Sequence, residues 1–305
     1  MKWGIALNVR DTISKTVDKS IIADRGGMDQ IWVTDFPALR YAPTVATAVA
    51  EKTTDCRIGV GLMSPLLYSS SHIVQFMTTL IKSHGERFDL LVGPGDRHAL
   101  ESVGVVVSPK AILERMKKAL SEIKSGLTEA NLDTRVLVGA QGPKMIEISR
   151  GVDGVLLNYS DLEMAKWAMN QLSDNISKRF QVGIFPPAYI GPCDNFITNT
   201  AISYSAAMVA LGLGKTVTNL FGVDYELKNA RKLLKIHGGI NDEVVRSIGD
   251  RILKRFAFCG SPKQLYRYIK ELEEIGYTNV VLGPPVGMSK KSIENLISVK
   301  TNIQI

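Results

Sequence analysis

The chain has 305 residues, of which 45% are hydrophobic and 22% charged, close to the average for a globular protein. It contains no apolar run of about 18 residues, which excludes a transmembrane helix, and its short apolar start lacks a signal-peptide cleavage site. The net charge is +7, but the basic residues are spread along predicted helices without interleaved aromatic residues. We therefore expect no nucleic-acid partner and no membrane partner.

The chain contains three cysteines, Cys56, Cys193 and Cys259, which are odd in number and far apart in the sequence. No Cys-x-x-Cys pair occurs, and the four histidines lack the spacing of a metal-binding motif. We therefore predict neither a disulfide framework nor a metal site. This cysteine usage is typical of a reducing compartment and predicts a cytoplasmic protein.

Short apolar runs that are typical of buried strands alternate with stretches of helical periodicity along the chain. In chain order the pattern predicts strand 2–8, helix 12–26, strand 30–34, helix 43–52, strand 57–62, helix 73–83 and strand 89–92. There follow helix 109–125, which Gly126 should end, strand 135–138, helix 143–149, strand 155–158, helix 162–172 and strand 181–185. A segment predicted to be helical throughout, 195–258, precedes helix 262–275, strand 279–282 and helix 290–297.

Eight strands, each followed by helix, predict a parallel sheet that closes into a (β/α)8 barrel. The competing fold, an open doubly wound sheet, would show a glycine fingerprint after the first strand. The first strand here runs instead into Asn8-Val9-Arg10-Asp11. We therefore predict a single α/β domain over residues 1–305, a TIM barrel with a helical insertion between its seventh and eighth strands.

Barrel enzymes place their active sites at the carboxyl ends of the strands, where this chain concentrates glycine and proline. The string Gly139-Ala140-Gln141-Gly142-Pro143-Lys144 leads from the fifth strand into a helix. Amides at a helix start attract anions, and Lys144 adds a positive charge, so this string is a candidate phosphate site. An ordinary strand-to-helix turn is the alternative.

Two aspartates follow predicted strands and are the candidate catalytic acids. Asp96 lies in the loop Gly93-Pro94-Gly95-Asp96 after the fourth strand, and Asp35 follows the second strand. A carboxylate there can exchange a proton with a substrate or hydrogen-bond a ring edge. Asp96 could equally cap a helix over 97–102. A structural role is an equal alternative for Asp35.

Three glycine-bearing strings, taken in order, resemble the luciferase-like superfamily. They are Gly93-Pro94-Gly95-Asp96, Gly139-Ala140-Gln141-Gly142-Pro143-Lys144-Met145 and Asp153-Gly154-Val155-Leu156-Leu157-Asn158. Near the carboxyl terminus, Phe258-Cys259-Gly260-Ser261-Pro262 and the segment 280–287 continue the likeness. Within the superfamily the chain is most similar to the archaeal methylenetetrahydromethanopterin reductases that depend on coenzyme F420.

The resemblance implies a barrel that binds the deazaflavin coenzyme F420 at its carboxyl face, with a cis peptide bond between Gly61 and Leu62. The implied reaction moves a hydride from reduced F420 to methylene-tetrahydromethanopterin, a small pterin substrate, in a homodimer or homotetramer. The implied cofactor-binding residues are Gly61, Leu62, Met63, Ser64, Gly93, Gly95, Gly139, Ala140, Gln141, Gly142, Pro143, Lys144 and Asn158.

The chain departs from this family at two positions. The family carries a glutamate on the first strand, where this chain has Ala6, and a histidine after the strand-two aspartate, where this chain has Phe36. General acid catalysis contributes roughly 10²–10⁴-fold, so the loss of one carboxylate matters. Three readings stay open: an F420-dependent reductase that uses Asp96 or Asp35, an FMN-dependent monooxygenase or NAD(P)H-dependent reductase, and a catalytically weakened binding paralogue.

Overall fold

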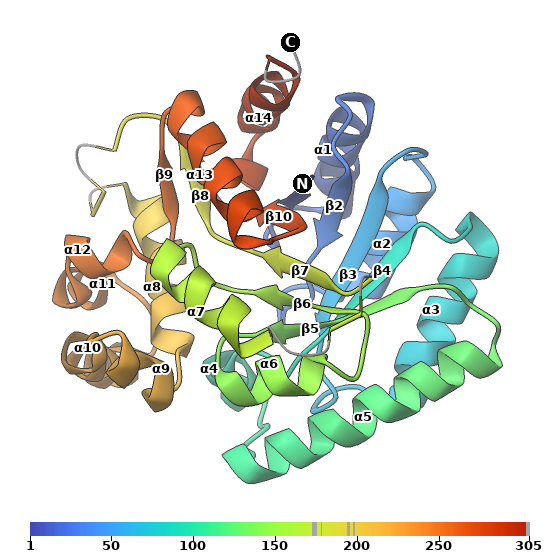
Figure 1. The fold of residues 1–305 in the computed structure, drawn as a ribbon, viewed down its shortest axis with the longest axis horizontal. Coiled ribbons are helices and arrows are strands. Elements are labelled where there is room, and N and C mark those ends of the chain that lie inside the picture. Colours follow the sequence, from blue (N-terminus) through green and yellow to red (C-terminus); the bar gives the residue numbers. More distant parts are fainter. Residues whose placement is uncertain (173–175, 178, 194–195, 198, 303–305) are drawn as a thin grey trace.

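The parallel strands of this chain form a closed sheet. A computed structural model of the chain describes residues 1–172, 176–177, 179–193, 196–197 and 199–302. Eight strands close into one barrel in the order β1-β10-β7-β6-β5-β4-β3-β2, and all neighbours are parallel (Figure 1). The barrel strands are β1 (Lys2–Ala6), β2 (Gln30–Val33), β3 (Arg57–Met63), β4 (Phe88–Val92), β5 (Arg135–Ala140), β6 (Gly154–Leu157), β7 (Gln181–Ile184) and β10 (Asn279–Leu282). The predicted (β/α)8 barrel is confirmed.

The strands read as unbroken apolar runs because both faces of the sheet are covered. Every residue of β2, β4 and β6 is buried. One face points into the barrel and the other packs against the surrounding helices. Those helices are α1 (Ile13–Arg25), α2 (Ala42–Ala50), α3 (Ser70–His84), α5 (Pro109–Glu129), α6 (Pro143–Ser149), α7 (Leu162–Leu172), α13 (Pro262–Ile275) and α14 (Lys290–Asn302).

Hydroxyl side chains at the helix starts fix several boundaries. Thr12, Ser69 and Ser108 each accept a hydrogen bond from the backbone amide three residues later, which satisfies a donor that the first helical turn leaves free. The predicted end of one helix is wrong, however, because α5 continues past Gly126 to Glu129. A Cβ at Gly126 would lie 3.0 Å from the side chain of Val74. The glycine therefore lets α3 and α5 approach closely and does not end the helix.

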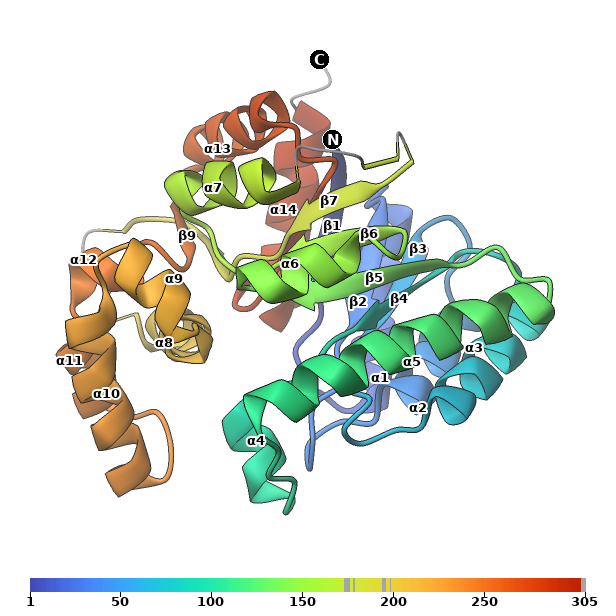
Figure 2. The ribbon, with the colours of Figure 1, turned by 60° about the horizontal axis from the view of Figure 1, so that its bottom comes forward.

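The insertion between β7 and β10 is mostly helical, as predicted, but it also contains two short strands. β8 (Ala188–Ile190) and β9 (Phe258–Gly260) pair in parallel outside the barrel. Between them lie α8 (Thr200–Gly212), α9 (Lys215–Leu220), α10 (Asp224–His237), α11 (Asp242–Ile248) and α12 (Asp250–Leu253). We call residues 200–253 the insertion lobe; Figure 2 shows it to one side of the barrel. Positions 195 and 198 of the predicted segment fall outside the described residues.

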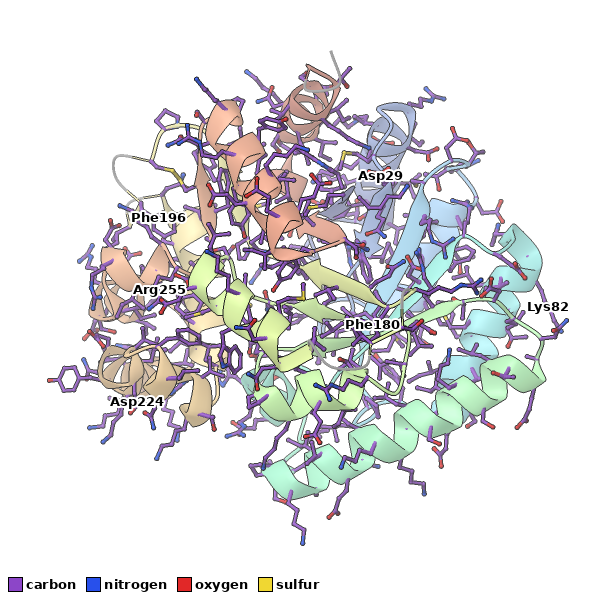
Figure 3. All side chains as sticks on the ribbon, in the orientation of Figure 1. Asp29, Lys82, Phe180, Phe196, Asp224 and Arg255 are labelled. Carbon is purple, nitrogen blue, oxygen red and sulfur yellow. A yellow bond between two sulfur atoms is a disulfide. The ribbon has the colours of Figure 1, made fainter. Side chains whose placement is uncertain are left out.

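The prediction of unpaired cysteines is wrong. Cys193 and Cys259 form a disulfide across 66 residues of sequence, with Cα atoms 5.9 Å apart (Figure 3). The sequence spacing hid this pair because the parallel pairing of β8 with β9 brings the two ends of the insertion together. Cys56 is a free, buried thiol.

Across the residues that the structure describes, no helix has both the length and the apolar character that a membrane crossing requires.

Candidate active site at the carboxyl end of the barrel

An apolar layer fills the barrel beneath the carboxyl ends of the strands. Each of the eight strands contributes one residue, either from the strand itself or, for β7, from the position that follows it. The layer consists of Ala6, Trp32, Leu62, Leu91, Leu137, Leu156, Phe185 and Val281. Six of these side chains are buried, whereas Leu62 and Phe185 are partly exposed. The layer itself contains no ionisable group, and its two exposed members give the mouth of the barrel an apolar floor.

Trp32 is the largest side chain of this layer and closes the barrel below the mouth. Its indole nitrogen donates to the side-chain oxygen of Gln30 at 3.2 Å. The ring occupies the space beside Gly59, where a Cβ would collide with it. Charged side chains lie at the amino ends of the strands instead, where Asp89 pairs with Arg57 at 2.9 Å and with Arg135 at 2.6 Å. Inside the barrel, the layer near the amino ends of the strands is therefore charged, whereas the layer near their carboxyl ends is apolar.

Leu62 lies over two of the glycines that the sequence singled out. A Cβ at Gly139 would lie 2.6 Å from Cδ1 of Leu62, and a Cβ at Gly93 would collide with the same atom. Gly61 has a φ of +145°, and its peptide bond to Leu62 is cis, as the resemblance implies. Gly61, Leu62, Gly93 and Gly139 thus form one surface, which we call the Leu62 platform. Gly93 and Gly139 therefore make room for the side chain of Leu62. The sequence did not predict this role.

The loops after β3 and β4 are held together by Ser64. Its hydroxyl donates to the carbonyl of Pro94 at 2.8 Å and accepts from the amide of Leu66 at 3.2 Å. Gly95 beside it has a φ of +88°, a backbone conformation that favours glycine. Met63 is buried in the core between sheet and helices, as is Ala140, the last residue of β5. Their side chains therefore do not line the mouth, although their backbones border it.

Asp96 caps a short helix, and this confirms one of its two predicted roles. Its Oδ1 accepts from the amide of Ala99 at 2.8 Å, and α4 (Arg97–Ser102) begins at the next residue. The carboxylate is partly exposed at the end of the Gly93–Asp96 loop. One oxygen thus has a structural partner, while the group as a whole stays accessible from the carboxyl face.

Asp35 is buried and directed toward α2. Its Oδ1 accepts from the amide of Ala42 at 2.8 Å, and its Oδ2 accepts from the hydroxyl of Tyr68 at 3.1 Å. Burial raises the pKa of the Asp35 carboxyl, and the two hydrogen bonds partly oppose this. Burial and the neighbouring carboxylate also raise the pKa of Tyr68. Both oxygens of Asp35 therefore serve the start of α2 and the loop after β3, which favours a positioning role.

The loop after β5 joins the barrel to the insertion lobe. The side-chain amide of Gln141 donates to the carbonyl of Asn158, which follows β6, and to that of Val209 in α8, both at 3.2 Å. Gly142 caps α6 without a side-chain hydrogen bond, and Lys144 is exposed in its first turn. The structure therefore brings most of the predicted cofactor residues to one face of the barrel.

A buried ionic cluster beside the mouth was missed from the sequence. Lys19 pairs with Asp11 at 2.6 Å and also donates to the carbonyl of Gly287, which lies in the loop after β10. Arg40 donates to the carbonyl of Asp11 at 2.9 Å and to the hydroxyl of Thr16 at 3.0 Å. These residues tie together the loops after β1, β2 and β10. One charge in helix α1 and one in each of the loops after β1 and β2 form no sequence motif.

A hollow lies at the amino end of the barrel, opposite the mouth. Its volume is about 650 Å³, and it is lined by β1, α13 and the end of α14. Its charges are already paired: the amino terminus with Glu273 at 2.8 Å, and Lys300 with Asp29 at 2.8 Å. Because barrel enzymes carry their sites at the carboxyl end, we place the candidate site at the Leu62 platform. Among the described residues, no group of three or more potential metal ligands occurs.

Comparison with known proteins identifies the family. The model of the luciferase-like monooxygenase family matches residues 4–279. The chain belongs to this family. Among its luciferase-like relatives, a 5,10-methylenetetrahydromethanopterin reductase from Methanolobus tindarius is 25% identical, with 97% of this chain and 98% of the relative aligned. A protein of the same name from Archaeoglobus fulgidus is 28% identical over 90% of this chain and 91% of its own length.

Two solved structures show the same fold. The coenzyme F420 dependent tetrahydromethanopterin reductase from Methanopyrus kandleri superposes with a TM-score of 0.82 at 21% identity, covering 97% of both chains. The EDTA monooxygenase from Chelativorans sp. BNC1 superposes with a TM-score of 0.70 at 13% identity, covering 99% of this chain and 94% of the other.

Proposed function

We propose that this luciferase-like protein is an F420-dependent oxidoreductase that reduces a methylene-tetrahydropterin. The observation that carries the proposal is the end-to-end alignment with relatives named methylenetetrahydromethanopterin reductase, at 25–28% identity. The superposition on the F420-dependent enzyme from Methanopyrus kandleri supports the proposal by showing that the two proteins share a fold. Fold alone would not choose this activity, since one barrel hosts many chemistries.

The residues present fit a flat ring with a polar tail. Leu62 and Phe185 offer apolar surface at the mouth, and Gly93 and Gly139 leave the space that the side chain of Leu62 occupies. The exposed cation of Lys144, in the first turn of α6, is the group that would meet a charged tail. When bound, the deazaflavin supplies the hydride. The chain's own residues would hold the ring against the apolar side chains of Leu62 and Phe185 and leave its other face to the substrate.

Proton supply is the second requirement of the reaction, because opening the one-carbon ring of the pterin needs an acid. The apolar layer has Ala6 at the position where the family carries glutamate, so it offers no proton. Both oxygens of Asp35 are bound to Ala42 and Tyr68. Asp96, partly exposed on the same face as the Leu62 platform, is the remaining carboxylate of the predicted pair. We assign it the proton exchange, and we assign Asp35 the positioning of Tyr68.

A second candidate function is an FMN-dependent monooxygenase or NAD(P)H-dependent reductase. The superposition on the EDTA monooxygenase at a TM-score of 0.70 favours it, because the same barrel there belongs to a monooxygenase. The Leu62 platform would seat an isoalloxazine ring as readily as a deazaflavin, since both are flat and apolar on their faces.

Cofactor binding and turnover separate these functions. The purified protein is titrated with F420 and with FMN, and binding is followed by the fluorescence of each ring. Reduced F420 and methylene-tetrahydromethanopterin are then mixed with the protein, and oxidation of the deazaflavin is followed by absorbance. We expect F420 binding and substrate-dependent oxidation. Retained FMN without F420 binding would support the monooxygenase alternative, and F420 binding without oxidation would support a weakened paralogue.

A further inference from the structure

The insertion lobe is attached to the barrel through a narrow two-stranded neck. The chain leaves the barrel through β8 and returns through β9, and the two strands run side by side with Tyr189 opposite Cys259. The amide of Gly191 extends the pairing by donating to the carbonyl of Gly260 at 2.9 Å. All five helices of the lobe lie between these two strands in the sequence. The position of the lobe therefore depends on what holds the neck closed.

A disulfide closes this neck. The bridge joins Cys193, just beyond β8, to Cys259 in the middle of β9, and it encloses the whole lobe within a loop of 66 residues. Both cysteines are partly exposed, whereas the third cysteine, Cys56, is only 2% exposed. A dissolved thiol or disulfide can thus reach the pair in the folded protein and cannot reach Cys56.

The enclosed lobe touches the loops of the candidate site. Val209 of α8 accepts a hydrogen bond from Gln141, and Val217 of α9 lies close to Gly142, 3.8 Å from where its Cβ would be. Next to this contact, beyond the neighbouring strand β4, the ring of His98 in α4 lies 3.4 Å from the carbonyl of Gly238 at the end of α10. A change at the neck can therefore reach the loops after β4 and β5 through the lobe.

A second anchor of the lobe lies beside the neck and does not depend on redox state. Arg255 pairs with Asp161 at 2.7 Å and with Glu163 at 2.9 Å, next to α7 (Figure 3). It also donates to the carbonyl of Phe221 at 3.1 Å. Opening the disulfide would consequently loosen the lobe without detaching it. Because Arg255 keeps the lobe in place, the two cysteines of the reduced protein stay close enough to form the disulfide again.

We propose that Cys193 and Cys259 form a reversible thiol–disulfide clasp that sets how tightly the insertion lobe is held against the candidate site. In closing, one cysteine thiolate attacks a sulfur of a low-molecular-weight disulfide and releases one thiol. The second cysteine then displaces the other thiol, so the protein loses two electrons and two protons and the reagent gains them. Opening by a dissolved thiol is the reverse. The clasp goes beyond the proposed function, and it does not depend on which cofactor the site binds.

Thiol labelling of the full-length protein tests whether the clasp opens and closes. The protein is equilibrated in glutathione buffers of increasing reduced-to-oxidised ratio, and free thiols are alkylated and counted by intact mass. We expect no label under oxidising conditions, two labels after reduction, and a third, on Cys56, only after unfolding. The Cys56→Ser variant should show the same change from zero to two. Two labels under every folded condition would overturn the proposal, as would none under every reducing condition.

Hydrogen exchange tests the coupling to the site. A cross-link around a loop of this length restricts opened states strongly, so reduction should speed exchange across α8–α10 by at least about tenfold. Through the Gln141 contact, residues 139–145 should exchange faster as well. The Cys259→Ser and Cys193→Ser variants should match the reduced protein in either buffer, and Cys56→Ser should respond like the wild type. Changes confined to β8 and β9 would overturn the clasp. Because no cofactor is added, both experiments stand apart from the proposed function.

Discussion

Alanine at Gly93 or Gly139 should disturb the protein through one shared neighbour, Leu62. A Cβ at Gly139 would lie 2.6 Å from Cδ1 of Leu62, and a Cβ at Gly93 would meet the same methyl. Ordinary carbon contacts need about 3.5–4 Å, so either substitution must move that methyl by roughly 1 Å. Leu62 is partly exposed, and the free direction is toward the mouth of the barrel. Both substitutions therefore push the same side chain into the proposed ring seat.

The expected energies follow from this geometry. Overpacking costs about 1–3 kcal/mol, and the lower half applies here because Leu62 can turn outward. Alanine in place of glycine also restricts the unfolded chain, which returns about 0.4–1 kcal/mol. We expect Gly139→Ala to lower the free energy of unfolding by roughly 1 kcal/mol. Leu62→Ala alone should cost about 2 kcal/mol, near the minimum for a leucine, because its side chain is only partly buried.

A double-mutant cycle measured by urea unfolding checks the reasoning. In the Leu62→Ala background the clash is gone, so Gly93→Ala and Gly139→Ala should become neutral or slightly stabilising, with a coupling of about 1–2 kcal/mol. Gly95→Ala is the matched control, because its cost comes from a φ of +88° and its nearest neighbour is Leu100 at 3.5 Å. Leu62→Ala should not rescue it. Additive effects at Gly139 and Leu62, within about 0.5 kcal/mol, would refute the shared-neighbour account.

Three further predictions concern the charged residues of the site. Asp96→Ala should lower the free energy of unfolding by about 1 kcal/mol, because it removes the side chain that caps the amide of Ala99. Asp96→Asn should keep this cap, and it should reduce turnover far more than cofactor affinity. Equal losses of turnover and affinity would point to a positioning role alone. Lys144→Ala should weaken F420 binding in a salt-dependent way, whereas the control Lys118→Ala, which removes an exposed charge, should not. An unchanged dissociation constant for Lys144→Ala would show that the loop after β5 is an ordinary strand-to-helix turn. Because burial raises the folded pKa of Asp35 above the unfolded value of 3.8, the stability it contributes is full below that pH and is lost as the pH rises through the folded pKa. The difference in unfolding free energy between wild type and Asp35→Asn should thus fall as the pH rises from 4 toward 7, and a difference that grew with pH would contradict the assignment.

The sequence alone determined the architecture of this protein. Strands buried on both faces leave continuous apolar runs, amphipathic helices leave a period of about 3.6 residues, and their eightfold alternation admits few topologies. Local chemistry was equally legible: the cap that Asp96 provides for α4 follows from an aspartate placed just before a helical stretch. The glycines at the strand ends are the basis for predicting a site at the carboxyl face of the barrel.

Only the tertiary structure decided what those residues contact. Asp35 turns toward α2 and Tyr68, although its place after β2 resembles that of Asp96 after β4. Cys193 and Cys259 meet across 66 residues because β8 and β9 pair, and strands of three residues leave too short a pattern to predict. Periodicity reports which face of an element is buried, whereas partners distant in the chain are chosen by the closure of the barrel and the packing of its loops.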